Sequence, residues 1–379
     1  MMTVSFGEAC SSGCRTEVED RMGYEFEPAC RRMEWLDPFY RNVWEKAFAE
    51  AIPISGTLEL TPRCNFDCQM CYVHLKEERI PLYGKELTAE EWLRVAKEAK
   101  EAGTAWLCVT GGEPLMHPEF PIIWKELCQM GFFITLQTNA SLIRGNMAEL
   151  LEEYPPRIAK VTLYGSDNDI YRDVCGVENG FTRVDEGIQT LKKLQIPVEM
   201  VSTVIRQNQN DVRNMAFYAF THKIPWMATG GIKDSCRGAD SRARSVRVED
   251  KLDEQKRKEI RYRLEKAPVD IERKPCTYCK DYRLGYWVTW NGRMRFCSFM
   301  NEPDIDIRRQ PFSRSWEELL AYEEALEWPD ACRECSVQKA CFKCAGTLAA
   351  ECGSPRSVTE EFCEKIKKYY DNQKGEWKL

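Results

Sequence analysis

The sequence predicts an α/β protein built on a parallel sheet. Strand-like and amphipathic helical runs alternate along the chain, which favours parallel strands joined by crossover helices. The strand-like runs are short, are rich in apolar and β-branched residues and are mostly bounded by turn-forming residues. They lie at 56–62, 105–110, 132–140, 157–165 and 198–205.

Helical runs follow these strands at 88–103, 120–131, 181–194 and 211–223. The first begins with Thr88 and Glu91, which have the spacing of a capping box. The second ends at Gly131, the residue type that most often closes a helix. An aromatic run at 33–52 predicts a further amphipathic helix that packs on this α/β unit.

Composition is that of a soluble, cytoplasmic enzyme. The chain has 379 residues, of which 30% are charged and 43% are hydrophobic, enough for one large and one smaller domain. No apolar run reaches membrane-spanning length, and the N-terminus lacks a secretory signal. The net charge of −6 gives no electrostatic footprint for nucleic acid. We therefore expect neither a membrane nor a nucleic-acid partner.

Three cysteines follow the first strand in the run CNFDCQMCY: Cys64, Cys68 and Cys71. Three thiolates can hold a four-iron cluster and leave one iron open, whereas a closed electron-transfer cluster takes four. Zinc is the alternative, because His74 lies nearby, although zinc sites usually pair a C-x2-C knuckle with a distant second pair. The 19 cysteines of this chain indicate metal binding and not disulfides.

The second strand runs directly into Gly111, Gly112, Glu113 and Pro114. Glycine lets the backbone approach a ligand closely, so main-chain groups here can bond a charged amino acid head. The third strand ends at Gln137, Thr138 and Asn139. Barrel enzymes collect ligand contacts at such strand ends, and ribose suits these polar groups. Ser166, Thr203 and Arg206 end the next two strands, where ordinary strand-to-loop residues are an equal alternative.

The cysteine triplet followed by GGEP resembles the signature of the radical S-adenosylmethionine (SAM) superfamily. The resemblance implies a partial (β/α)6 barrel in which the open iron chelates SAM and reduces it to a 5′-deoxyadenosyl radical. It implies that the GGE segment bonds the amino group of SAM and that Met70 contacts adenine.

The C-terminal part carries a second set of cysteines, and eight thiolates would complete two further clusters. Its spacing, a Gly292-x4-Cys297 element followed by two C-x2-C pairs, resembles the SPASM domain. By position, auxiliary cluster I would take Cys276, Cys279, Cys297 and Cys344, and auxiliary cluster II Cys332, Cys335, Cys341 and Cys363. The two C-x2-C pairs alone would suit zinc equally well. With SAM, the predicted cofactors are three four-iron clusters.

These features predict five segments: an N-terminal extension at 1–54, mainly helical; the radical SAM barrel at 55–235; a charged linker with one solvated helix at 236–274; the SPASM domain at 275–365; and a tail at 366–379. Arginines between Arg237 and Arg247 could grip an acidic peptide or form a solvated face. No role is predicted for Cys10, Cys14, Cys30 or Cys352.

The resemblance implies that the enzyme abstracts hydrogen from a ribosomally synthesised peptide and forms a thioether or carbon–carbon crosslink. Epimerisation would need a thiol donor, for which we consider Cys175 and Cys236 because both are expected in loops; Cys108 and Cys128 are assigned to the core. Sulfatase-type oxidation is in doubt, because Ser298 stands where that group has an aspartate.

Two other functions stay open at this point. One is a radical dehydrogenase of a sugar or cyclitol, and the other is an iron–sulfur electron-transfer protein without SAM chemistry, which would leave GGEP unexplained. The expected partners are the peptide, a flavodoxin- or ferredoxin-type reductant and a separate leader-binding protein, because the first 54 residues are short for a leader-binding domain.

Overall fold

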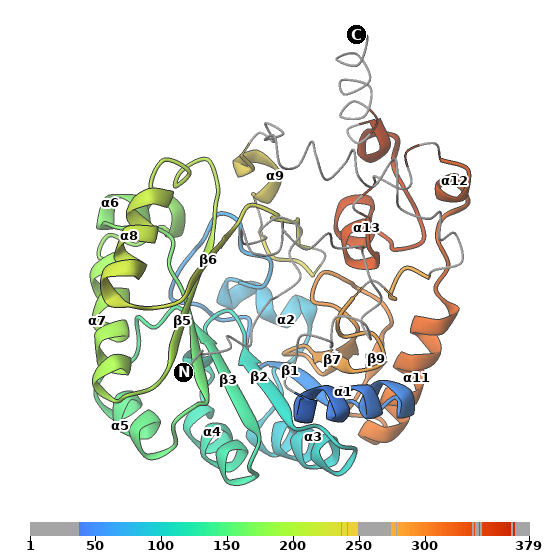
Figure 1. Cartoon of the computed structure of the whole chain (residues 1–379), viewed down its shortest axis with the longest axis horizontal. Coiled ribbons are helices and arrows are strands. Elements are labelled where there is room, and N and C mark those ends of the chain that lie inside the picture. The colour runs from blue at the N-terminus through green and yellow to red at the C-terminus, as the bar shows by residue number, and fades with distance from the viewer. Residues whose placement is uncertain are drawn as a thin grey trace.

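The computed structural model describes residues 38–235, 237–240, 242–248, 274–277, 279–335, 337, 341, 343–364 and 367. Within these residues, one sheet of nine strands runs through the molecule in the order β6-β5-β4-β3-β2-β1-β7-β8-β9 (Figure 1). The first six strands in sequence are all parallel to their neighbours. They are β1 (Ser55–Glu59), β2 (Trp106–Thr110), β3 (Phe133–Thr138), β4 (Ile158–Thr162), β5 (Val198–Thr203) and β6 (Trp226–Thr229).

Helices follow these strands and cover the outer side of the sheet (Figure 1). Their bounds are α3 (Ala89–Glu101), α4 (Phe120–Gln129), α5 (Asn146–Glu153), α6 (Asn168–Cys175), α7 (Gly180–Lys193) and α8 (Val212–His222). Two short pieces precede α3, namely η2 (Glu77–Arg79) and α2 (Ile80–Tyr83), and η3 (Pro114–Met116) precedes α4. The predicted α/β class is confirmed, with β6 as a strand that the sequence pattern did not reveal.

The predicted helix ends are confirmed at two places. Thr88 caps α3 through a reciprocal capping box with Glu91. Gly131 lies just beyond α4 with a φ of 77° and donates its amide to Cys128 O. That backbone conformation is open to glycine without a Cβ penalty, so the residue type defines where the helix stops.

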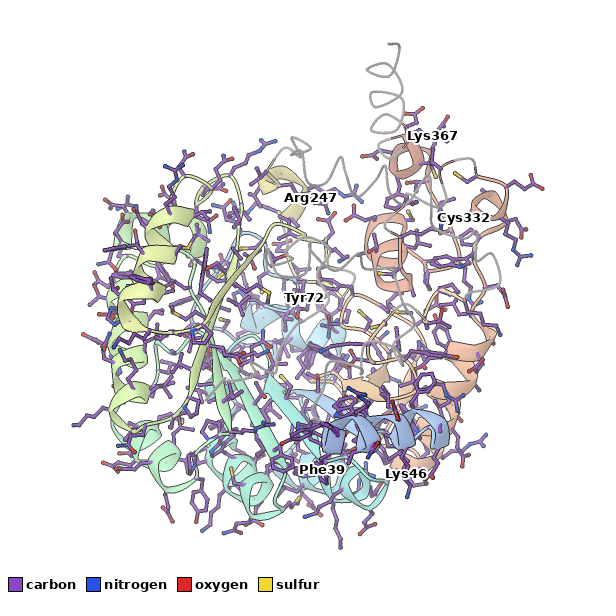
Figure 2. All side chains as sticks on the ribbon, viewed as in Figure 1. Phe39, Lys46, Tyr72, Arg247, Cys332 and Lys367 are labelled. Atoms are coloured by element: carbon purple, nitrogen blue, oxygen red, sulfur yellow. The ribbon has the colours of Figure 1, made fainter. Side chains whose placement is uncertain are left out.

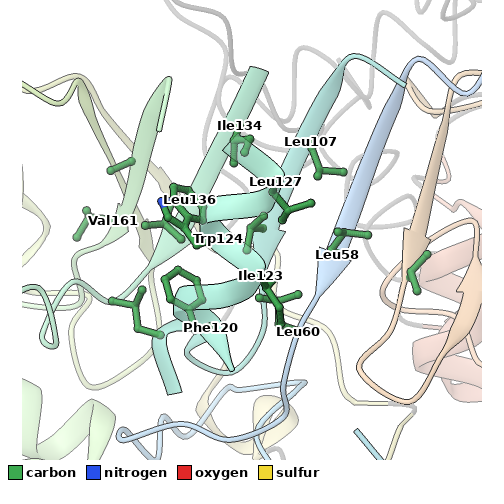
Figure 3. Close-up of a cluster of buried hydrophobic side chains, with 14 of the residues drawn as sticks. Leu58, Leu60, Leu107, Phe120, Ile123, Trp124, Leu127, Ile134, Leu136 and Val161 are labelled. Carbon is green, nitrogen blue, oxygen red and sulfur yellow. The ribbon is translucent and has the colours of Figure 1, made fainter. Parts of the chain in front are cut away.

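The hydrophobic core lies between the strands and the helices α3 and α4, and Figure 3 shows the part that packs under α4. Trp92, Phe120 and Trp124 are fully buried there. Burying a large apolar side chain contributes about 1.5–3 kcal/mol, so these three residues fix the helices on the sheet. Alternate strand residues such as Leu107 and Val109 point into this core, and their neighbours face the opposite, concave side.

Helix α1 (Pro38–Glu50) packs at the amino end of the sheet. The Trp44 ring lies 5.5 Å from the Trp106 ring at the start of β2, and Ala47 packs with Ile54 and Leu284. The described part of the aromatic run is therefore a helix that packs on the barrel, as expected. Residues 1–37, with Cys10, Cys14 and Cys30, lie outside the described part of the chain.

The C-terminal part continues the barrel sheet. Strand β7 (Gly285–Val288) pairs in parallel with β1, so that Gly56 lies opposite Tyr286. A Cβ on Gly56 would fall 2.2 Å from the Tyr286 ring, so only glycine permits this contact. Among the described elements, this part also contains two antiparallel strands, β8 (Arg293–Arg295) and β9 (Ile305–Asp306), and the helices α11 (Phe312–Ala325), α12 (Asp330–Arg333) and α13 (Ala345–Cys352).

The charged linker is described only in part. Residues 237–240 and 242–248, with the short helix α9 (Ala243–Val246), are placed, and the solvated helix expected further along lies outside the described residues. The described residues resume at Lys274, where the C-terminal part begins. No helix within the described ranges combines the length and apolar character needed to cross a membrane.

Candidate active site

The predicted site residues gather at one edge of the sheet because all six barrel strands run in the same direction. The cysteine run follows β1, GGEP follows β2, and Gln137 and Thr138 end β3. Ser166 follows β4, and Thr203 ends β5. Groups far apart in the sequence therefore meet at the carboxyl ends of the strands, where barrel enzymes bind their ligands.

The loop with Cys64, Cys68 and Cys71 is held by its own backbone and by α6. Cys64 Sγ accepts a hydrogen bond from the Phe66 amide at 3.4 Å, and Cys71 Sγ accepts one from the His74 amide at 3.2 Å. The amides of Asp67 and Gln69 donate to Cys175 O and Val174 O at 2.9 and 3.0 Å. The loop therefore keeps one shape with amides aimed at its sulfurs.

The donor set fits an iron–sulfur cluster. Burial raises the pKa of Cys64, and a thiol hydrogen bond with Cys175, followed by burial, raises the pKa of Cys68. Burial raises the pKa of Cys71 to about 11. These thiols are protonated without metal and would release protons on binding it. Among the described residues, no three metal-binding side chains surround a single ion position; a cluster instead offers separate irons to its thiolates.

The glycines of GGEP are required by close backbone packing. A Cβ on Gly111 would lie 2.7 Å from Thr61 O, and one on Gly112 would lie 2.4 Å from Arg63 O. The amides of Gly112 and Glu113 donate to those same two oxygens at 2.7 and 2.8 Å. The strand end after β2 thus supports the segment that leads into Cys64, a function that the sequence did not reveal.

Glu113 is completely buried and holds the ends of β2 and β3 together. Its Oε1 accepts hydrogen bonds from the Leu115 amide at 3.2 Å and from Thr138 Oγ1 at 2.7 Å. Its Oε2 accepts one from the Asn139 amide at 2.8 Å. Burial raises the pKa of Glu113 to about 7, although these three donors oppose the shift.

Residues around Cys64 form a small polar network. Asn139 Nδ2 lies 3.9 Å from Cys64 Sγ and donates to Asn65 Oδ1 at 3.0 Å. The Ser141 hydroxyl donates to Asn139 Oδ1 at 2.6 Å. Met70 and Pro114 are buried beside the loop and in η3 respectively. Asn139 is therefore placed next to the first cysteine as well as at the end of β3.

The remaining predicted contacts are tied to neighbours that sequence reasoning missed. Ser166 donates its amide and hydroxyl to Asp211 at 2.7 and 2.8 Å. The Arg206 side chain donates to Arg247 O at 2.9 Å, and its amide donates to Val246 O. Thr203 O accepts from Asn208 Nδ2 at 3.0 Å. Asp211 had no signal in the sequence, because it reads as an ordinary helix start.

The concave face of the sheet carries polar side chains below this edge. Lys160 Nζ lies 3.5 Å from Glu199 Oε2 on the adjacent strand. Cys108 Sγ lies 3.9 Å from Gln137 Oε1, and burial raises the pKa of this thiol to about 11. Cys108 was assigned to the core, but its neighbours Leu107 and Val109 occupy the core and the thiol faces the concave side.

The expectation that Cys175 lies in a loop is wrong. It is the last residue of α6, completely buried, with its thiol against Cys68. The regular spacing of apolar residues in α6 carries it into the helix. Cys236, the other thiol considered, lies outside the described residues.

The cysteines predicted for auxiliary cluster I come together from three separate segments. Cys276 and Cys279 precede β7, Cys297 follows β8, and Cys344 caps α13. Burial is the main cause that raises the pKa values of Cys276 and Cys279. The charges of Cys297 and Cys344 add to both shifts. Cys344 also raises the pKa of Cys297. The charges of these thiols thus affect one another's pKa values, so the four cysteines lie in the same region.

The second predicted set lines one pocket. Figure 2 labels Cys332 at the upper right of the molecule, on α12. Burial raises the pKa of Cys332 and raises that of Cys341 to about 11, and Lys343, which shares the pocket, is the main charge that opposes these shifts. After burial, the charge of Cys352 is one of the smaller causes that raise the pKa values of Cys332 and Cys363. The four predicted cysteines in the lining are Cys332, Cys335, Cys341 and Cys363.

Comparisons with known proteins agree with this arrangement. Residues 58–219 match the sequence profile of the Radical SAM superfamily. The chain is 28% identical over 158 residues to the PqqA peptide cyclase of Bradyrhizobium diazoefficiens, and 26% identical over 166 residues to the subtilosin biosynthesis protein AlbA of Bacillus subtilis. These matches cover 41% and 44% of this chain but only 40% and 36% of the two relatives.

The fold also matches a solved structure. SuiB of Streptococcus suis bound to S-adenosylmethionine has a TM-score of 0.62 at 15% identity, and the match covers 86% of this chain and 81% of SuiB. SuiB has also been solved with its precursor peptide SuiA, with a TM-score of 0.61, 15% identity and coverage of 87% and 82%. The comparisons therefore show similarity to the Radical SAM superfamily over residues 58–219 and a fold shared with SuiB.

Proposed function

We propose that the chain cleaves SAM at the Cys64–Cys71 loop and modifies a ribosomally synthesised peptide. The observation that carries the proposal is the meeting of the three thiols with the β2 and β3 ends at one edge of the sheet, within a chain whose second cysteine region continues that sheet. SuiB is bound to a precursor peptide in a solved structure, and the PqqA peptide cyclase is named for a peptide substrate. Both support a peptide substrate here.

The three cysteines of this loop would hold one four-iron cluster, and Cys276, Cys279, Cys297 and Cys344 another. A third would bind in the pocket of Cys332, Cys335, Cys341 and Cys363. A cluster bound in the first loop supplies the electron that splits SAM. The protein contributes a fixed loop, amides directed at the sulfurs and a buried edge. The α12–α13 pocket offers the third cluster the same kind of ligand, cysteine sulfur.

Backbone groups at the strand ends would position SAM. An amino group needs hydrogen-bond acceptors, and the Gly111–Glu113 segment offers its main chain beside the cysteine loop. The Gln137–Asn139 end and Ser166 lie along the same edge, where a ribose would find donors and acceptors. Met70 offers an apolar surface for adenine.

A substrate residue on the concave face would meet Cys108, Gln137, Lys160 and Glu199. Crosslink formation removes two hydrogens from the peptide and needs an electron acceptor, whereas epimerisation needs a hydrogen donor. Cys108 stays protonated at neutral pH because burial raises its pKa. It is thus the described thiol best placed to serve a redox-neutral reaction.

The test is anaerobic reconstitution with iron and sulfide, reduction with dithionite and addition of SAM with candidate peptides. We expect 5′-deoxyadenosine from wild-type protein and none from the Cys64/Cys68/Cys71→Ala variant. Cys128→Ala, which removes a thiol on α4 at the back of the sheet, is the matched control and should behave as wild type.

Mass spectrometry of the peptides then defines the reaction. A loss of two hydrogens indicates a crosslink. In deuterated water, uptake of deuterium without the loss of two hydrogens indicates epimerisation. 5′-Deoxyadenosine that increases with sugars or cyclitols but with no peptide would contradict the peptide substrate. Absence of 5′-deoxyadenosine from iron-loaded wild type would contradict SAM cleavage itself.

A further inference from the structure

A buried ion pair crosses from the end of β1 to the segment that follows β6. Glu59 is the last residue of β1 and is completely buried, and the Arg237 side chain is 10% exposed. Arg237 Nη1 donates to Glu59 Oε1 at 2.6 Å, and Nη2 donates to Oε2 at 2.7 Å. This is the two-pronged geometry in which arginine binds a carboxylate most specifically.

The pair is fastened to the auxiliary cysteine region. Arg237 Nε donates to Ser298 O at 3.2 Å, and Ser298 is the neighbour of Cys297. The Trp287 indole on β7 donates to Glu59 Oε2 at 3.1 Å. Glu59 and Arg237 therefore connect the end of β1 with β7 and with the turn after β8 that carries Cys297.

The same pair contacts the loop of the first three cysteines through Tyr72, the neighbour of Cys71. Burial, and after it the Glu59 carboxylate, raises the pKa of Tyr72, whereas Arg237 and Ser298 oppose the shift, so the Tyr72 hydroxyl lies close to the pair. The Tyr72 ring lies 4.7 Å from the Phe299 ring, and Tyr72 O accepts a bond from the Ser235 hydroxyl at 3.0 Å. Figure 2 labels Tyr72 near the centre of the molecule.

Two other arginines of this segment, Arg244 and Arg247, also pair with carboxylates of the chain itself. Arg244 pairs with Asp234, and Arg247 forms a two-pronged pair with Glu351 at the end of α13. The Arg244 side chain is 55% exposed, whereas Arg237 is almost completely enclosed. Arg237 thus differs from its neighbours in burial and in its contacts with both cysteine regions.

Burial of two charges is seldom a net source of stability, because the loss of hydration offsets their attraction. What a forked, fully hydrogen-bonded pair provides is a defined geometry, which a lysine with its single ammonium cannot reproduce. The pair lies where two cysteine regions must keep a fixed separation. That placement indicates a function in positioning.

We propose that Glu59 and Arg237 are positioning residues that fix the Cys71–Tyr72 end of the first cysteine loop against the Cys297–Ser298 turn. The pair thereby sets the relative position of the SAM site and of auxiliary site I, the set of Cys276, Cys279, Cys297 and Cys344. This inference rests on the proposed function of the two sites. Loss of the pair leaves both cysteine sets intact but changes how the sites are placed with respect to each other.

The test compares reconstituted wild type with Arg237→Gln, Arg237→Lys and the control Arg244→Gln. We expect all four proteins to load the same iron. The relaxation enhancement that the neighbouring cluster causes in the electron paramagnetic resonance signal of the reduced SAM-site cluster should change in both Arg237 variants and stay as in wild type in Arg244→Gln. Peptide product formed per 5′-deoxyadenosine should fall on the order of 10²-fold in the Arg237 variants, the cost of a small misplacement.

Unchanged relaxation and unchanged product per 5′-deoxyadenosine in both Arg237 variants would overturn the inference. If Arg237→Gln does not load iron, Arg237→Lys decides, because it keeps the buried charge and loses only the forked geometry. If wild type forms no 5′-deoxyadenosine, the proposed function fails, while the relaxation measurement still decides whether Arg237 positions the two sites.

Discussion

The two cysteine regions of this chain are built in opposite ways. The loop from Cys64 to Cys71 is local, with three thiols within eight residues that are shaped by their own amides and by α6. Auxiliary site I brings together thiols that precede β7, follow β8 and begin α13. The first site therefore depends on one loop and its support, whereas the second depends on the completed fold.

This difference explains the position of β7. The strand pairs with β1 and lies between the segments that carry Cys279 and Cys297. A site assembled from distant segments needs a rigid frame, and the barrel sheet provides it. The local loop, in turn, is supported from behind by Gly111 and Gly112, whose backbone contacts leave no space for a side chain.

The largest expected effect is the separate loss of clusters. Wild-type protein should bind about twelve irons, as three four-iron clusters require. Cys68→Ala should remove about four irons and all 5′-deoxyadenosine formation, whereas Cys335→Ala should remove about four irons and leave SAM cleavage in place. Iron analysis with a 5′-deoxyadenosine assay checks this. Equal loss of SAM cleavage in both variants would contradict the independence of the two regions.

The buried carboxyl behind the local loop should make stability depend on pH. Burial raises the folded-state pKa of Glu113 to about 7, so the folded protein binds this proton more tightly than the unfolded chain. The free energy of unfolding should therefore fall as pH rises from about 4.5 to about 7, by about 3 kcal/mol from this group.

Denaturant unfolding of the reduced, metal-free protein measures this slope. Glu113→Gln should flatten it between these pH values, and Glu153→Gln, a change on the exposed side of α5, should leave it as in wild type. A slope that is identical in wild type and Glu113→Gln would mean that Glu113 titrates alike in both states.

A methyl group behind the local loop should weaken that loop. In Gly112→Ala the new Cβ would lie 2.4 Å from Arg63 O, which forces the backbone apart and costs about 1–3 kcal/mol. Gly230→Ala is the matched control, since no atom lies within 4 Å of its Cβ position. Thermal unfolding should show a lower midpoint for Gly112→Ala alone. Equal midpoints would show that the loop adapts freely.

The smallest expected effect concerns the pocket of the second region. Lys343 lowers the pKa values of Cys332 and Cys341, so Lys343→Met should slow alkylation of these thiols by a factor on the order of two. Lys125→Met, on α4, should leave their rates unchanged. Mass spectrometry of alkylated apoprotein distinguishes the sites. Faster alkylation in Lys343→Met would contradict the electrostatic influence of this lysine.

The local site was predictable because its signal is contiguous. The Cys64–Cys71 spacing, the strand before it and the capping box at Thr88 all lie within single segments. The SPASM-type spacing also predicts which distant cysteines belong together, and this grouping stays a prediction. Patterns of this kind are visible wherever residue type and spacing alone define a structure.

The rest could not be predicted because it depends on tertiary contacts. Glu59 reads as an ordinary strand residue, and only the folded chain brings Arg237 to it across 178 positions. Asp211 and Lys343 likewise acquire meaning through Ser166 and the cysteine pocket. The error at Cys175 has a different, local origin, since the regular apolar spacing of α6 extends the helix to this residue.

The most direct measurement is the Mössbauer spectrum of protein reconstituted with ⁵⁷Fe, recorded with and without SAM. We predict about twelve irons per chain, of which about one changes its spectrum when SAM is added, in wild type but not in the Cys64/Cys68/Cys71→Ala variant. A spectrum indifferent to SAM, or zinc in place of iron, would contradict the assignment of this loop as the site of SAM cleavage.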